Sequence, residues 1–300
     1  MYIFVLPLCS MAAALVLLSE MLLSAYPILI KQVDTSVFFQ TGLRMGIYSV
    51  LAGTAGVLTG ASVPIANLWS VEGIATGLLN LFHVGSSYTA FEQLPAGNAM
   101  ALFYIYPVFN ILGAAAAFGE SVPYASLPWI ALAFFGTLLL AQPTPKNWTL
   151  IGVICALIAA ATETCIYLWF RSKSKDGESD TQPWTKMAQM YGSSGLWWIL
   201  VAIVGSVLGL LAKNTFRLSL GGLGTIALFN ALVGFVGYAL RFYLIPRVST
   251  VVFSVLSFFG VISAYGFGWI FQGEVPNYTQ LAGAVAIVVA NAVLMSKENN

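Results

Sequence analysis

Long apolar segments alternate with short polar or Gly- and Pro-containing stretches along the whole 300-residue chain. A helix needs roughly 20 consecutive apolar residues to cross the hydrocarbon core of a bilayer. Ten segments meet this requirement, and each predicts one membrane-spanning helix. The segments cover about residues 3–30, 36–60, 68–92, 96–118, 124–141, 148–170, 187–211, 219–244, 248–271 and 278–296. The pattern therefore predicts an all-α polytopic membrane protein.

The longest polar interruption lies between the sixth and seventh segments, where residues 171–184 read RSKSKDGESDTQPW. It is the one long, strongly charged loop that the sequence predicts. The first apolar segment contains no Lys or Arg before Lys31. It therefore lacks the basic n-region of a cleavable signal peptide, and we expect it to be the first span.

The composition agrees with a membrane protein and narrows the chemistry. Hydrophobic residues make up 59% of the chain and charged residues 8%, against roughly 25% charge in a soluble domain. A net charge of +1 offers no basic face for a nucleic acid. Cys9, Cys155 and Cys165 are too few and too scattered for a disulfide framework or a metal centre. Because no catalytic or metal-ligating motif is present, we expect no catalytic residue, no metal and no cofactor.

The distribution of Lys and Arg predicts the orientation, because cytoplasmic loops are enriched in both. With both termini in the cytoplasm, seven Lys or Arg fall inside and five outside. The inside set is Arg171, Lys173, Lys175, Lys186, Arg241, Arg247 and Lys297, and the outside set is Lys31, Arg44, Lys146, Lys213 and Arg217. We expect this orientation, in a plasma (inner) membrane.

The chain resembles itself across its midpoint. Residues 91–107 read FEQLPAGNAMALFYIYP, and residues 242–258 read FYLIPRVSTVVFSVLSF. Pro95 and Pro246 then match at an offset of 151. Each proline is followed by an apolar helix that ends in a Gly-Glu pair.

The two Gly-Glu pairs contain Glu120 and Glu274. Two copies of five helices must lie in opposite orientations in the membrane, because five is odd. We therefore expect one five-helix repeat in residues 1–145 and an inverted copy in residues 146–300. Inverted repeats of this kind are the architecture of many secondary transporters. In those proteins the solute site lies near the bilayer midplane, where the two halves meet.

These motifs resemble a known family. The stretch LPAGNAMALFYIYPVFNILGAAAAFGE is similar to the second part of the repeat in the drug/metabolite transporter superfamily, in its EamA-like branch. IPRVSTVVFSVLSFFGVISAYGFGWIFQGE resembles the same pattern, except that Phe258 stands where the first copy has Pro107. The resemblance implies ten helices with cytoplasmic termini. It also implies a central cavity lined mainly by helices 1, 3, 4, 6, 8 and 9, and alternating access without ATP.

Two glutamates occupy matched positions in the first helix of each repeat. Glu20 lies in LLSEMLLSAY and Glu163 in AATETCIYLW, at an offset of 143. A charged carboxylate at mid-bilayer costs about 2.5–3.5 kcal/mol even on the mildest insertion scale, so such residues usually face a cavity or a partner. Both are candidate solute ligands and candidate proton carriers. A buried structural glutamate, hydrogen-bonded to a neighbouring helix, is the alternative for each.

The third predicted helix carries a polar line of Thr76, Asn80, His83 and Ser87. Spacings of 4, 3 and 4 place all four on one helical face. We expect Asn80, His83 and Ser87 to bind solute. His83 is the only histidine in the chain and a further proton-coupling candidate, because histidine is readily switched near neutral pH.

Further candidates lie on the remaining cavity helices. Pro107 should loosen the fourth helix near mid-membrane and expose backbone carbonyls. The other predicted solute-binding residues are Tyr106, Asn110, Tyr167, Tyr238 and Ser257. Glu120 and Glu274 are expected to be structural, since both end helices. Arg44 and Arg241 are also near helix ends, where snorkelling to the interface would be sufficient.

The leading hypothesis is a secondary or facilitative transporter of a small polar organic solute, such as an amino acid, an amine or a related metabolite. Two carboxylates and several tyrosines favour a cationic or zwitterionic solute. The alternatives are a divalent metal-cation transporter and a membrane enzyme, the latter less favoured because it lacks a nucleophile or metal constellation. The expected partners are the solute and the lipid bilayer, with the chain as a monomer or homodimer.

Overall fold

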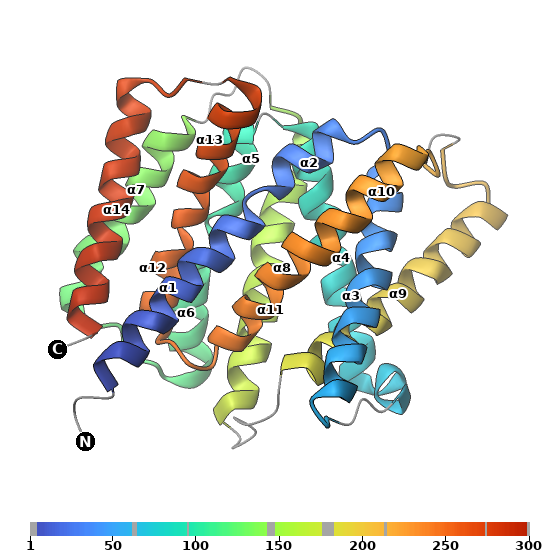
Figure 1. Cartoon of the computed structure of the whole chain (residues 1–300), viewed down its shortest axis with the longest axis horizontal. Helices are drawn as coiled ribbons and strands as arrows, with labels where there is room; N and C mark the ends of the chain where they lie inside the picture. The colour runs from blue at the N-terminus through green and yellow to red at the C-terminus, as the bar shows by residue number, and fades with distance from the viewer. Residues whose placement is uncertain are drawn as a thin grey trace.

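The computed structural model describes residues 5–61, 65–94, 96–142, 148–175, 183–212, 215–273 and 275–298. Within these ranges every regular element is a helix, so the predicted all-α polytopic class is confirmed (Figure 1). The repeat residues Pro95 and Glu274 and the middle of the charged loop, residues 176–182, lie outside the described ranges.

The described residues form ten long helical segments, five in each half. The first half contains α1 (Val5–Leu23) with α2 (Tyr26–Gln32), α3 (Val37–Leu58), α4 (Val71–Gln93), α5 (Ala96–Phe103) with α6 (Tyr106–Phe118), and α7 (Leu127–Ala141). Short 3₁₀ helices, η1 (Ile65–Trp69) and η2 (Tyr124–Ser126), precede α4 and α7.

The second half repeats this order. It contains α8 (Leu150–Lys175), α9 (Pro183–Val207), α10 (Leu220–Phe229) with η4 (Asn230–Gly234) and α11 (Phe235–Leu244), α12 (Thr250–Ser257) with α13 (Phe259–Gln272), and α14 (Tyr278–Glu298). The start of α9 is four residues earlier than the sequence predicts, because Pro183 provides the helix start despite the polar residues that follow.

Eight of the ten segments are long and apolar enough to cross a membrane. The other two, α3 and α4, have 22 and 23 residues, which at 1.5 Å per residue also exceeds the roughly 30 Å hydrocarbon core. They are more polar than the rest, and several of their polar side chains are buried inside the bundle rather than facing outward. The polar side chains that distinguish α3 and α4 from the other helices thus point into the bundle.

Four of the long segments are interrupted near their middles. The interruption between α5 and α6 precedes Pro107, as predicted, and the one between α1 and α2 precedes Pro27. Proline removes a helical hydrogen bond and disfavours helix in the residue before it. The segment of α12 and α13 breaks at Phe258 without a proline. The fourth interruption is η4, a π-helical turn, a form that is frequent at functional sites.

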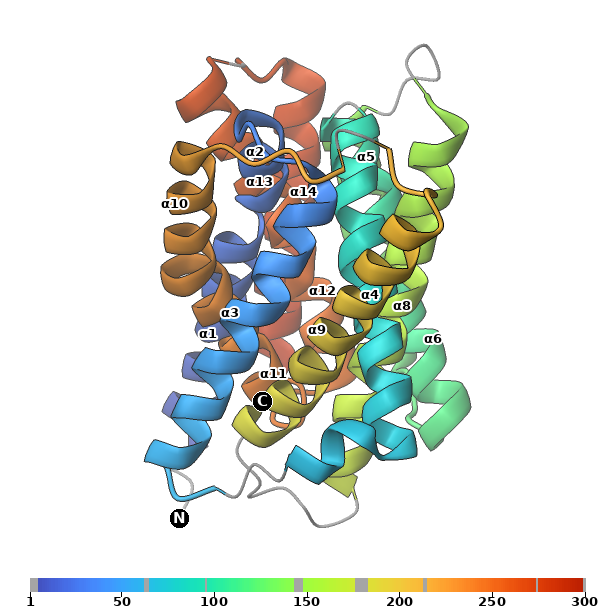
Figure 2. The same cartoon turned by 90° about the vertical axis from the view of Figure 1, so that its right-hand side faces the viewer.

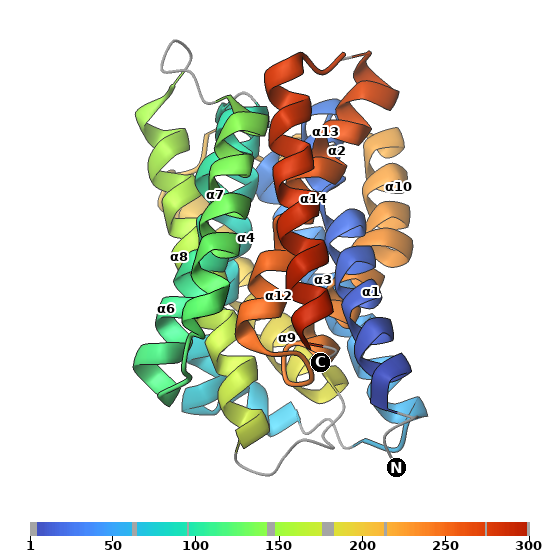
Figure 3. The same ribbon diagram turned by 90° about the vertical axis from the view of Figure 1, so that its left-hand side faces the viewer.

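Helix packing forms a few strong pairs. In the first view α7 and α14 lie together at one side of the molecule and α3 and α9 at the other (Figures 1 and 3). Between them α4 packs against α8 and α9, and α1 packs against α11 (Figure 2). The first turn of α1 and the last turn of α14 lie at the same end of the bundle (Figure 3). We call it the terminal end.

The Gly-Glu pairs have a backbone reason. Gly119 ends α6 at a φ of 65°, and Gly273 ends α13 at a φ of 70°. Glycine adopts this left-handed conformation without the steric cost of a Cβ atom and is the preferred residue just after a helix. The motif therefore stops two helices at corresponding positions of the two halves.

Candidate functional site

The two matched glutamates meet on one arginine. Arg241 of α11 is 3% exposed, and its Nη1 contacts Glu20 Oε1. Its Nη2 lies 2.7 Å from Glu163 Oε1. The expectation that Arg241 snorkels to the interface is therefore wrong. Helical side chains tilt toward the helix N-terminus, so an arginine in the last turn of α11 reaches back into the bundle.

His83 extends this group. Its Nε2 lies 3.2 Å from Glu163 Oε2, and its Nδ1 lies 3.2 Å from the carbonyl oxygen of Ala159. Glu20, Arg241, Glu163 and His83 form a continuous set from α1, α11, α8 and α4, which we call the charge cluster. With both glutamates ionised and His83 neutral, its net charge is −1, from two carboxylates and one guanidinium.

Polar aromatic side chains surround Glu20. The hydroxyls of Tyr104 and Tyr106 point at its carboxylate, at 3.5 Å and 3.4 Å from Oε2. These distances are long for O–H···O⁻ hydrogen bonds, which are usually below 3 Å. Ser257 of α12 neighbours the same carboxylate. Gly260 permits the arrangement, because a Cβ atom there would collide with the Tyr104 hydroxyl.

A second arginine lies in the same region in a different environment. Arg44 of α3 is 1% exposed, so the expectation that it snorkels is also wrong. Five tyrosine rings from five helical segments surround its guanidinium, which we call the tyrosine cage. The distances from Arg44 Cζ to the ring centroids are 4.3 Å for Tyr238, 5.0 Å for Tyr26, 5.2 Å for Tyr48, 5.7 Å for Tyr88 and 6.0 Å for Tyr191.

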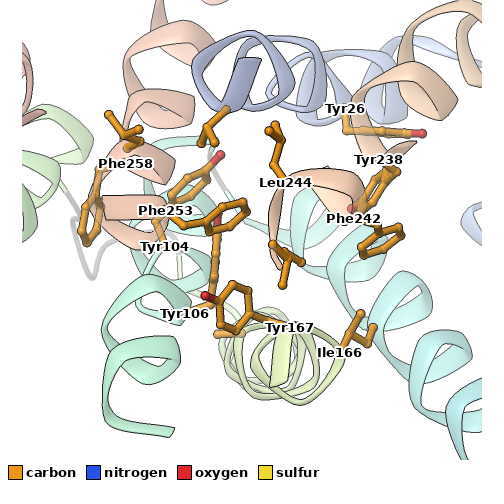
Figure 4. Close-up of a cluster of buried hydrophobic side chains, with 14 of the residues drawn as sticks. Tyr26, Tyr104, Tyr106, Ile166, Tyr167, Tyr238, Phe242, Leu244, Phe253 and Phe258 are labelled. Carbon is orange, nitrogen blue, oxygen red and sulfur yellow. The ribbon is translucent and has the colours of Figure 1, made fainter. Parts of the chain in front are cut away.

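One small cavity joins the charge cluster to Arg44. Its wall contains the whole charge cluster, Arg44, and the tyrosines Tyr26, Tyr88, Tyr104, Tyr106 and Tyr238. Figure 4 shows four of these tyrosines, all but Tyr88, in the buried interior. The cavity measures about 30 Å³, room for one or two waters. The helices therefore leave little free space around the charged centre.

The structure brings most of the predicted site residues together. Glu20, His83, Ser87, Tyr106, Glu163 and Tyr238 line the cavity, and Ser257 lies beside Glu20. Three predicted residues lie elsewhere. Asn80 donates hydrogen bonds to Ser194 of α9 at 2.9 Å and to Met45 of α3 at 3.4 Å, so it ties three helices together.

The other two lie toward the terminal end. Asn110 is buried in α6, and neither polar atom of its side chain has a partner among the described residues. Tyr167 donates a hydrogen bond to Thr250 at 3.0 Å. Thr250 in turn donates to Glu120 at 2.6 Å. Tyr167 thus belongs to a separate network at the end of α6, away from the charge cluster.

That network is held by Arg171 at the end of α8. Its Nε lies 3.0 Å from Glu120 Oε1, and its Nη1 donates to the carbonyls of Ile245 and Val248, both at 2.9 Å. Glu120 also borders a second cavity of about 370 Å³ between α6, α12 and α14. The ion pair therefore ties three segments together beside a space at the terminal end.

The opposite end of the bundle has a corresponding contact. Lys31 at the end of α2 donates to the carbonyl of Leu94 at 2.9 Å. The residue numbers of Leu94 and Ile245 differ by 151, the offset between the two halves. Leu94 directly follows α4, and Ile245 directly follows α11. A cation at the end of the first segment of each half thus binds the carbonyl at the end of the third.

Sequence reasoning missed Arg44, Arg241 and the tyrosines Tyr26, Tyr88 and Tyr104. The signal for the arginines was available, since an ionisable residue inside an apolar segment is a functional candidate by default. The tyrosines carried no comparable signal, because tyrosine is common at membrane interfaces and in packing.

No group of three or more His, Cys, Asp or Glu that could hold a metal ion occurs in the part of the chain that the structure describes.

A buried site of paired charges between helices that span a membrane is typical of a transporter. Residues 10–142 match the family model of the EamA-like transporter family. The chain is 22% identical over 299 residues to the pseudopaline exporter CntI of Pseudomonas aeruginosa, in strains PAO1 and UCBPP-PA14, covering 95% of this chain and 96% of the relative. Both matches support the predicted classification in the EamA-like branch of the drug/metabolite transporter superfamily.

A solved structure supports the same fold over the whole chain. A protein of known crystal structure superposes with a TM-score of 0.72 and 18% sequence identity. The match covers 94% of this chain and 97% of that protein. At this identity the likeness concerns the fold alone.

Proposed function

We propose that the protein is a secondary transporter that moves a small polar organic solute, cationic or zwitterionic, by alternating access. Amino acids, amines and related metabolites have this chemistry. The observation that carries the proposal is the small cavity whose charge cluster holds two carboxylates and one guanidinium. Each glutamate directs one oxygen to Arg241, and its other oxygen has only long contacts at 3.2–3.5 Å. Those oxygens are the proposed ligands of the solute's amino group.

Two inverted repeats, residues 1–145 and 146–300, are the architecture that we propose for alternating access. Helix contacts support it, because exchanging the halves maps one set of contacts onto another. The pair of α1 and α11 corresponds to the pair of α8 and α4, while α7 with α14 and α3 with α9 correspond to themselves. We propose that both termini are cytoplasmic. The relatives named as exporters favour outward movement of the solute.

Proton coupling is proposed to run through His83, Glu163 and Glu20. Both ring nitrogens of His83 face acceptor oxygens, on Glu163 and on Ala159. A neutral imidazole can donate to only one of them, so an added proton gains a second donor contact. Because Glu163 shares Arg241 with Glu20, protonation at His83 changes the charge that the cavity offers to the solute.

A divalent-cation carrier receives less support. Such a carrier needs several oxygen ligands around one point. Here the guanidinium of Arg241 lies between the two carboxylates, where a divalent cation would have to bind. The pair is thus already neutralised in part by the chain's own cation.

Uptake by proteoliposomes tests the proposal. The purified full chain is reconstituted, and uptake of labelled amino acids and amines is measured with and without a pH gradient. Glu20→Gln and Glu163→Gln should each lower uptake at least tenfold, since a charge-assisted contact contributes about 1.5–3 kcal/mol. Asp34→Asn, at an exposed pair with Arg217, is the matched control and should transport normally. Unchanged uptake in both glutamine variants would refute the proposal, and uptake that ignores the gradient would assign facilitative exchange.

A further inference from the structure

Arg44 is a buried cation without an anion. None of the ion pairs of the described residues includes it. Its Nη2 donates to the Tyr191 hydroxyl at 3.3 Å, and its Nε has no partner among the described residues. Removing a guanidinium from water is costly unless an anion and further hydrogen bonds replace the lost hydration. The contrast with Arg241, which contacts two carboxylates, is therefore large.

The tyrosine cage supplies part of the compensation. Cation–π contact with aromatic faces stabilises a guanidinium, and five rings lie within 6.0 Å of Arg44. Ring faces do not accept the planar N–H donors as an oxyanion such as a carboxylate does, since a carboxylate matches the guanidinium fork with two parallel hydrogen bonds. The cage thus holds the charge in place and leaves donor capacity unused.

The cage is open toward the cavity. Tyr26, Tyr88 and Tyr238 line the cavity wall together with Arg44, whereas Tyr48 and Tyr191 do not. The cavity wall thus contains the charge cluster, with two carboxylates and one guanidinium, and the separate guanidinium of Arg44. A solute with an amino group and a carboxylate matches both kinds of charge.

We propose that Arg44 and the tyrosine cage form the carboxylate subsite of the transported solute. The inference rests on the transport function proposed above and narrows its solute class from cationic or zwitterionic to zwitterionic. In this proposal Arg44 binds the carboxylate through its guanidinium edge, and Tyr88 and Tyr238, which line the same cavity beside Arg44, offer hydroxyl donors to the same group. The charge cluster then binds the amino group.

Matched pairs of acids and amines test the subsite. Proteoliposomes of the full chain are assayed for uptake of histidine and histamine, arginine and agmatine, and tyrosine and tyramine, each labelled. Within a pair only the carboxylate differs. We expect at least one pair in which the wild type takes up the acid at least tenfold better than the amine. Arg44→Gln should lower uptake of that acid at least tenfold and change uptake of its amine less than threefold.

Two further variants keep the result interpretable. Arg44→Lys retains the positive charge and should keep the preference for the acid at a weaker apparent affinity, even if Arg44→Gln does not fold. Arg217→Gln removes an arginine with 56% side-chain exposure and should change neither probe. Folding of each variant is monitored by its elution in size-exclusion chromatography.

The outcomes distinguish a carboxylate subsite at Arg44 from a purely structural role of this residue. Equal uptake of acid and amine in every pair overturns the subsite, as does an Arg44→Gln or Arg44→Lys variant in which the acid and the amine are lost to the same extent. Such a result would assign Arg44 to the packing of the tyrosine cage, with the transport function intact. If no acid or amine is taken up at all, the proposed function fails and the inference fails with it.

Discussion

Removing the Arg241 side chain should strongly destabilise the protein. Arg241 contacts Glu20 and Glu163, and the three side chains are 1–3% exposed. Arg241→Met keeps the volume approximately but leaves two buried carboxylates with His83 as their remaining charged or titratable neighbour in the cluster. Breaking a buried ion pair by removing one partner costs about 3–5 kcal/mol. We expect a loss of that size in the free energy of unfolding.

A triple variant separates the charge effect from the loss of packing. Glu20→Gln, Glu163→Gln and Arg241→Met together leave no charged carboxylate or guanidinium in the cluster, and buried ion pairs replaced by neutral groups of similar volume are often tolerated. The triple variant should therefore recover most of the stability that Arg241→Met loses, and it should not transport. This recovery is the non-additivity expected of residues in direct contact.

Equilibrium unfolding in mixed detergent micelles provides the measurement. The chain contains eight tryptophans, so intrinsic fluorescence can follow the transition. Arg217→Met, at the exposed pair with Asp34, is the control and should cost less than about 1 kcal/mol. An Arg241→Met protein that is as stable as the wild type, or a triple variant less stable than Arg241→Met, would refute the reasoning.

Three further predictions concern the wall of the charge-cluster cavity and the terminal end of the bundle. Gly260→Ala would push a methyl group into a tyrosine hydroxyl of the wall and should cost about 1–3 kcal/mol, whereas Gly266→Ala on the same helix has open space and should be tolerated. In the thermal melt of the two variants, equal midpoints would contradict this. Glu120→Gln should speed thiol labelling of a cysteine introduced at Val251, because the ion pair beside the terminal-end cavity is lost; unchanged labelling would argue against a closing role. Asn110→Leu should raise the melting temperature, since it removes a buried amide without partners, and a lower value would indicate that the amide is satisfied in solution.

Much of the fold follows from the sequence, because apolar length alone defines membrane helices. The break before Pro107 followed from proline chemistry. The break at Phe258 could not be predicted, because no residue there lacks an amide N–H and only the packing of α12 and α13 distinguishes it. The π-helical turn at Asn230–Gly234 has no local signal for the same reason.

The site was predicted unevenly. Glu20 and Glu163 were identifiable because two carboxylates, which are costly inside a membrane, stand at matched positions of the proposed repeat. Asn80 and His83 share a helical face, yet they face different neighbours: Asn80 contacts α9 and His83 contacts α8. Spacing along one helix defines a face but cannot define which helix covers each turn of it. Arg241 was missed because its position near a helix end suggested that it reaches the interface. The sequence does not show that its side chain points back into the bundle.

Solute counterflow is the most direct test of the central claim, that the cavity around the charge cluster carries a small polar solute. Proteoliposomes are loaded with one unlabelled amino acid or amine and diluted into the labelled compound, so that exchange needs neither ATP nor an ion gradient. We expect transient accumulation of label with the wild type for at least one compound. We expect none with the Glu20→Gln, Glu163→Gln double variant that elutes as a folded protein. Equal accumulation in both proteins would contradict the central claim.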